Sequence, residues 1–132
     1  MANAKIIAML LACDSVQYDK DANAMRLGHV INAIDVPVFP YACKLTFFVK
    51  LLEIPTDHTL DFAIQVVDPM GVMVVRTPYK ALYNMRADDQ IPGVDTGENV
   101  LLVASVPGIH WARMMIDNEI VFEIPITIRK KQ

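Results

Sequence analysis

Residues 108–129, GIHWARMMIDNEIVFEIPITIR, decide the fold of this 132-residue chain. From Glu119 onward, apolar residues recur at every second position, a period that is typical of a β-strand and not of a helix. The apolar face of this strand carries Ile120, Phe122, Ile124, Ile126 and Ile128. Residues 108–116 read as its partner strand, and Asp117-Asn118 forms the turn, because both residue types tolerate left-handed backbone. The stretch therefore predicts a C-terminal β-hairpin.

The rest of the chain repeats the pattern of short apolar strands and turns. Further strands are predicted at residues 4–13, 25–34, 45–52, 60–67, 72–76 and 98–106. About eight strands without a convincing segment of helical period predict an all-β, single-domain fold over residues 1–132, an antiparallel β-sandwich of two sheets. Pro125 has no N–H to donate, so we expect an open side or a bulge at that point of the last strand.

One stretch, residues 77–97, interrupts the alternation. About twenty residues is long for a connection in a compact domain. Within it, residues 78–86 could form one or two helical turns, and residues 88–97 read as irregular loop. Its cations and tyrosines could bind an anionic or aromatic ligand; the candidates are Arg76, Tyr79, Lys80, Tyr83 and Arg86. The alternative is a solvated connector whose two aromatic side chains lie on the sheet edge.

Composition and charge exclude several classes of protein. Hydrophobic residues make up 54% of the chain and the net charge is only −3, which argues against disorder and, without a basic excess, against nucleic-acid binding. No segment reaches the ~18 apolar residues of a membrane span. Cys13 and Cys43 are too few for a disulfide framework, so free buried thiols in the reducing cytoplasm are expected, with a single bridge as the alternative.

The N-terminal segment is also compatible with a second cellular location, a membrane anchor. Residues 10–13, Leu-Leu-Ala-Cys, resemble the cleavage box of bacterial lipoproteins, which would anchor the chain through Cys13. The apolar run before Cys13 is short for a signal peptide, and its positive flank is Lys5 alone. We therefore expect a first strand at this place, with the lipoprotein as the minor alternative.

No motif for catalysis, a metal or a cofactor is present in the sequence. The three histidines lie far apart in the chain: His29, His58 and His110. A G-x-S-x-G elbow, a zinc-ligand spacing and a glycine-rich phosphate loop are all missing. Residues 19–23 resemble the start of a calcium loop, but Ala24 and Val30 replace its glycine and its final glutamate, so an acidic hairpin turn is expected. We expect no enzyme, no metal and no cofactor.

Seven short motifs, in this order and spacing, resemble an uncharacterised bacterial family of small Ig-like β-sandwich proteins, a domain of unknown function. They are Cys13-Asp14-Ser15, Leu27-Gly28, residues 36–40, residues 67–71, residues 107–110, residues 116–119 and residues 123–126. The resemblance spans almost the whole chain and implies a fold and a bacterial source, but no activity. Two departures are His110, where an aromatic residue is usual, and the long stretch at residues 77–97.

The resemblance also orients the first strand of the hairpin. The inward residues are then His110, Ala112, Met114 and Ile116. The outward residues of this strand, together with Phe48, are the candidate interface: Trp111, Arg113, Met115 and Phe48. The alternatives are that the loop of residues 77–97 or the N-terminal strand covers these side chains, or that a face is reversed by one residue.

These features predict a non-enzymatic bacterial interaction module or structural subunit that acts through protein–protein contacts or self-association as a homo-oligomer. The alternative is a β-sandwich that binds a small ligand or a carbohydrate through residues 77–97.

Overall fold

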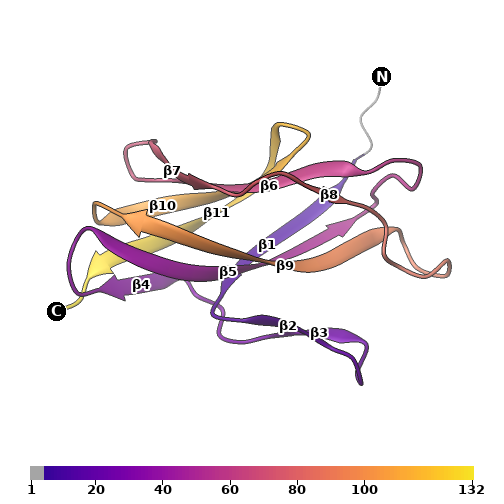
Figure 1. The fold of residues 1–132 in the computed structure, drawn as a ribbon, viewed down its shortest axis with the longest axis horizontal. Helices are drawn as coiled ribbons and strands as arrows, with labels where there is room; N and C mark the ends of the chain where they lie inside the picture. The colour runs from indigo at the N-terminus through magenta and orange to yellow at the C-terminus, as the bar shows by residue number, and fades with distance from the viewer. Residues whose placement is uncertain (1–4) are drawn as a thin grey trace.

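Residues 5–132 are described by a computed structural model, which contains strands but no helix in that part of the chain (Figure 1). The strands are β1 (Ile7–Cys13), β2 (Val16–Asp19), β3 (Ala24–Leu27), β4 (Ala33–Val36), β5 (Tyr41–Leu52), β6 (Leu60–Val67), β7 (Met73–Arg76), β8 (Lys80–Leu82), β9 (Gly93–Ala104), β10 (Gly108–Ile116) and β11 (Glu119–Lys130). The predicted all-β class is confirmed. The described residues contain no helix of the length and apolarity needed to cross a membrane.

Two sheets enclose a common core, and a hairpin lies outside them (Figure 1). The smaller sheet has the order β1-β5-β9, and the larger has the order β4-β11-β10-β6-β7, with β8 also paired to β6. Strands β2 and β3 form the separate hairpin. The pairs are antiparallel except that β4 runs parallel to β11, which corrects the prediction of purely antiparallel sheets.

The core follows from the alternation of apolar residues. Fully buried side chains come from both sheets, among them Phe47, Leu102, Phe62, Met114 and Ile126. Each large apolar side chain buried in this way contributes about 1.5–3 kcal/mol to the free energy of unfolding. This shared layer holds the two sheets together.

The C-terminal hairpin is confirmed as strands β10 and β11. Its turn residues Asp117 and Asn118 both have positive φ, 50° and 68°, as a two-residue hairpin turn requires. Strand β4 pairs with β11 only from Thr127 onward, and the N–H of Thr127 points to that side. Backbone N–H groups point to the same side at every second residue of a strand, so the nitrogen of Pro125 faces the same side as the N–H of Thr127. Strand β4 does not extend as far as Pro125, so the predicted open side is present.

The predicted strand at residues 25–34 is wrong, because the chain leaves one sheet for another within it. Strand β3 ends at Leu27 in the outer hairpin, and β4 begins at Ala33 in the larger sheet. Between them, Gly28 packs so closely that a Cβ there would lie 2.0 Å from Oδ1 of Asp14. The first predicted strand is observed as β1, although residue 4 lies outside the described residues.

The helix predicted within residues 78–86 is also wrong. Residues 80–82 form β8, which pairs with β6 and buries Leu82. Strand β9 begins at Gly93 instead of residue 98 and pairs with β5 over its whole length. A Cβ on Gly93 would lie 2.3 Å from the carbonyl oxygen of Leu51, so the missing side chain allows this early start. The irregular connection is therefore much shorter than the sequence suggested.

Candidate functional site

Strand β10 presents the candidate interface on the outer face of the larger sheet. The side chains of His110, Ala112, Met114 and Ile116 are buried on the inner face. On the outer face Trp111 is 36% exposed, whereas Arg113 and Met115 are partly covered. Nε of Arg113 lies 3.1 Å from Oε2 of Glu123 on β11, so this cation is already held in a cross-strand ion pair.

Exposed apolar side chains gather around Trp111. Trp111 lies in register between Pro125 on β11 and Val67 on β6, and Val67 is in turn paired with Met73. We call the set of exposed side chains here the Trp111 face; it comprises Ile109, Trp111, Met70, Val72 and Met73. Met70, at 71% exposed, is the most accessible of them.

Close packing between two turns assembles the Trp111 face. Gly108 begins β10 with φ 130°, and a Cβ there would lie 2.7 Å from Cγ of Pro69. The turn between β6 and β7 is therefore held against the start of β10. Sequence reasoning missed Met70, Val72 and Met73, although three apolar residues in and after a turn, where polar residues are usual, are a signal of an exposed apolar surface.

Phe48 does not belong to the Trp111 face, and the prediction that it is exposed is wrong. It is only 8% exposed and lies on the outer face of the smaller sheet, between Leu11 and Gly97 in register. Val16 of the outer hairpin lies over Gly97, within 3.1 Å of where its Cβ would be. The hairpin therefore covers this part of the sheet, whereas the sequence alternative named the loop of residues 77–97 or the N-terminal strand as the cover.

The candidate ligand residues between 76 and 86 do not all gather in one place. Arg76 lies over the ring of Tyr79, 5.2 Å from its centroid, and the Tyr79 hydroxyl donates to Oδ1 of Asn118 at 2.6 Å. Lys80 is paired with Glu98, Nζ to Oε2 at 2.8 Å. Tyr83 is 53% exposed.

Arg86, the fifth ligand candidate, belongs to an ionic cluster on the smaller sheet. Its Nη2 lies 3.0 Å from Oδ1 of Asp95, which also accepts from Nζ of Lys50 at 3.2 Å. Two of the three candidate cations are thus neutralised by carboxylates of β9. The structure brings Arg76 and Tyr79 together, but not the five residues around one hollow.

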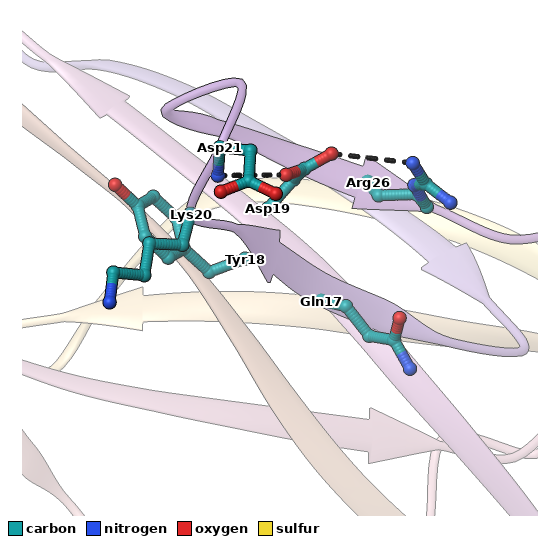
Figure 2. A pocket seen from close by; sticks show the side chains of 6 residues that line it. All are labelled: Gln17, Tyr18, Asp19, Lys20, Asp21 and Arg26. Carbon is teal, nitrogen blue, oxygen red and sulfur yellow. Dashed lines mark hydrogen bonds and ion pairs between the residues drawn. The ribbon is translucent and has the colours of Figure 1, made fainter.

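A polar hollow of about 330 Å³ lies at the outer hairpin. Figure 2 shows the Asp19 carboxylate between Arg26 and Asp21, with Lys20 and Gln17 directed elsewhere. Oδ1 of Asp19 accepts from the N–H of Asp21 at 3.1 Å, and Oδ2 lies 3.3 Å from Nη2 of Arg26. The acidic residues thus form the predicted hairpin turn, and no group of three metal-ligating side chains occurs in residues 5–132.

Asp14 and His29 form an exposed pair beside a buried thiol. Nδ1 of His29 lies 2.7 Å from Oδ2 of Asp14, and the His29 N–H donates to Oδ1 at 2.8 Å. These hydrogen bonds lower the pKa of Asp14. Burial, with the charge of Asp14, raises the pKa of the adjacent Cys13 thiol, the opposite of what activates a nucleophile. Cys13 and Cys43 are both free and buried, as expected.

We expect His29→Ala to raise the pKa of Asp14 toward its ordinary value of 3.8, because the side-chain hydrogen bond is lost. The lowered pKa means that ionised Asp14 stabilises the fold above about pH 3.8, and that this contribution is lost as the pH falls through the folded-state pKa. A titration of the carboxyl ¹³C shifts by NMR measures the change. His58→Ala is the matched control: it should raise the pKa of Asp57 and leave that of Asp14 where it was. Equal titration of Asp14 in all three proteins would contradict the expectation.

A second hollow, of about 430 Å³, lies where β4 and β5 begin. Its lining residues are Ile31, Ile34, Tyr41, Ala42, Cys43, Lys44, Leu45 and Leu101. Sequence reasoning did not identify it, because its two walls belong to different sheets and come together only through the crossover between them.

These surfaces and this fold define a class of small all-β domain in which two sheets enclose one core and leave an apolar face exposed. The chain belongs to the family of unknown function DUF6941, which matches residues 8–129. The expected resemblance to an uncharacterised family is thereby confirmed at the level of the family. No curated protein matches the chain.

Solved structures resemble the fold at low sequence identity. The alkylpurine DNA glycosylase AlkC of Pseudomonas fluorescens, bound to DNA containing an abasic site analogue, is similar with a TM-score of 0.56 and 11% identity, over 97% of this chain and 31% of the glycosylase chain. A β-glucosidase of Listeria innocua, in complex with isofagomine, has a TM-score of 0.47 and 11% identity, over 98% of this chain and 17% of its own. The likeness to the glycosylase shows a shared fold alone, and this chain corresponds to less than a third of it.

Proposed function

We propose that this chain is a non-enzymatic module that binds another protein, or a further copy of itself, through the Trp111 face. The supporting observation is that β10 and the turn after β6, which lie close together at Gly108 and Pro69, both carry exposed apolar side chains. Exposed apolar side chains that gather on neighbouring strands and turns mark interaction sites on proteins. Tryptophan supplies much of the binding energy at such sites, and methionine adapts to the shape of a partner.

The chemistry of the remaining candidate sites supports a module without catalysis. The Cys13 thiol is buried and its pKa is raised, which is the opposite of what activates a nucleophile. Lys80 and Arg86 are held in ion pairs, which weakens the case for a small anionic ligand at residues 77–97. Binding of a small ligand or a carbohydrate there stays a prediction that a thermal-shift screen tests.

Our proposal includes the finer class and setting of the module. We infer an Ig-like sandwich from two sheets around one core, and a bacterial, cytoplasmic protein from the motifs and the two free thiols. The lipoprotein anchored through Cys13 remains the alternative. Lipidation at Cys13 would remove β1, which supplies an edge of the smaller sheet.

We expect Trp111→Ala to weaken the complex by roughly 30-fold, because a hot-spot tryptophan contributes about 2 kcal/mol or more. Size-exclusion chromatography with light scattering measures the self-associated form, and titration calorimetry measures a partner that co-purifies from the source cells. Tyr18→Ala, on an aromatic that is 60% exposed on the outer hairpin, is the matched control and should leave the complex intact. A chain that stays monomeric at all concentrations and loses no partner on Trp111→Ala would overturn the proposal.

A further inference from the structure

The first five residues of β5, the central strand of the smaller sheet, have a neighbouring strand on one side only. The pairing of β1 with β5 ends at Cys13 opposite Thr46, where the chain turns away into the outer hairpin. Residues 41–45 of β5 continue beyond this point and pair with β9 alone. Among the described residues, no other strand lies against this edge.

The backbone groups on this edge can be assigned from the neighbouring hydrogen bonds. The carbonyl of Ala12 accepts from Ile31, and the N–H of Asp14 donates to His29, so these two residues of β1 face away from β5. Because direction alternates, Cys13 faces β5, and its partner Thr46 faces β1. Backbone direction repeats at every second residue, so Lys44 and Ala42 face the same side as Thr46. Their N–H and C=O groups therefore point to the side where β1 has ended and no strand of the described chain follows.

An apolar hollow adjoins these unpaired groups. Its walls include Cys43 and Leu45 from the inner face of β5, and Ile31 and Ile34 from the segment that crosses to the larger sheet. Its volume of about 430 Å³ lies within the range of ligand-binding hollows. A strand added to this edge would place every second side chain in the hollow.

Three lysines without an ion-pair partner among the described residues lie on β5 and at the end of β11. Lys44 is exposed on β5 and has no ion-pair partner in the described chain, and the same holds for Lys130 and Lys131. Lys130 is in register with Val36 at the end of β4, and the N–H of Lys131 donates to the Val36 carbonyl at 2.7 Å. Figure 1 shows the end of β11 beside the turn that leads from β4 into β5. An acidic partner complements these charges.

We propose that residues 41–45 of β5 bind an extended, acidic segment of a partner protein as an added strand, antiparallel to β5 and in line with β1. Partner residues opposite Ala42 and Lys44 form the backbone hydrogen bonds and point their side chains outward, where acidic groups meet Lys44. Those opposite Cys43 direct apolar side chains into the hollow. Main-chain hydrogen bonds then supply affinity and the hollow supplies specificity. This site lies on a different sheet from the Trp111 face and does not depend on it.

Displayed random decapeptides selected on the immobilised full chain provide the probe, and fluorescence anisotropy of the synthesised winners measures affinity. We expect peptides in which acidic and apolar residues alternate. N-methylation at their acidic positions should weaken binding by about tenfold or more, because those N–H groups bond to β5, whereas N-methylation at their apolar positions should change it by less than about threefold. Higher salt should also weaken binding.

Two variants locate the site on the protein. Ala42→Pro removes an N–H that faces the open edge, so it should abolish peptide binding and leave the melting temperature nearly unchanged. Trp111→Ala should not affect the peptide, which separates this site from the Trp111 face. The proposal is overturned if no peptide is enriched or if N-methylation acts equally at all positions. It is also overturned if Trp111→Ala, instead of Ala42→Pro, abolishes peptide binding. A peptide whose only effect is to disrupt a dimer would overturn it too, because the occupant of the edge would then be a second copy of this chain.

Discussion

Phe48→Ala should lower the free energy of unfolding by about 3 kcal/mol and the melting temperature by on the order of 10 °C. The apolar alternation along β5 places Phe48 on the outer face, where truncation would change little. In the structure the ring is buried under the outer hairpin, so its removal leaves a cavity between the hairpin and the smaller sheet. Thermal and urea denaturation followed by circular dichroism measure the loss.

The matched control is Tyr41→Ala on the same strand. Tyr41 is exposed, so its truncation should cost less than about 1 kcal/mol. If Phe48→Ala costs no more than Tyr41→Ala, the hairpin does not cover the sheet in solution.

Gly108→Ala should destabilise the fold by about 3 kcal/mol. The φ of 130° at this position is one that side chains rarely adopt, and the new Cβ would lie 2.7 Å from Cγ of Pro69. Because the contact with Pro69 also assembles the Trp111 face, the variant should bind partners less well. Denaturant unfolding and the binding measurement for Trp111→Ala test the two consequences.

Gly71→Ala separates the backbone contribution from the contact. Gly71 also has positive φ, 83°, but a Cβ there meets nothing within 4 Å, so this variant should cost only about 1 kcal/mol. The double variant Gly108→Ala with Pro69→Ala should recover part of the lost stability. Equal costs for Gly71→Ala and Gly108→Ala would show that the two turns are not held together through Pro69.

Local signals were sufficient where strands adjacent in sequence pair with one another. The C-terminal hairpin, its Asp117-Asn118 turn and the open side at Pro125 all follow from period-two alternation and turn chemistry. The same signals fail where a chain segment changes sheets. Gly28 lies within the strand predicted at residues 25–34, but its close approach to Asp14 marks the departure from the outer hairpin.

The candidate sites depend on contacts between distant segments, which alternation does not reveal. Trp111 could be placed on an outward face, but its neighbours Met70 and Met73 come from another turn. The covering of Phe48 requires knowing where the outer hairpin folds back, and the consecutive apolar residues 47–49 were the available sign that both faces of β5 are covered. Nothing in the sequence indicated that Lys80 and Arg86 form ion pairs with carboxylates of β9.

The parallel pairing of β4 with β11 has a consequence for biosynthesis. Residues 33–36 are translated about ninety residues before their partner residues 127–130. Until then the edge of β4 has no neighbouring strand, and Val36, which is fully buried in the folded protein, lacks part of its cover. At about 5–20 residues per second, this interval lasts several seconds. During this time the nascent chain exposes an unpaired strand edge, which chaperones can cover. It completes its larger sheet only once translation reaches β11.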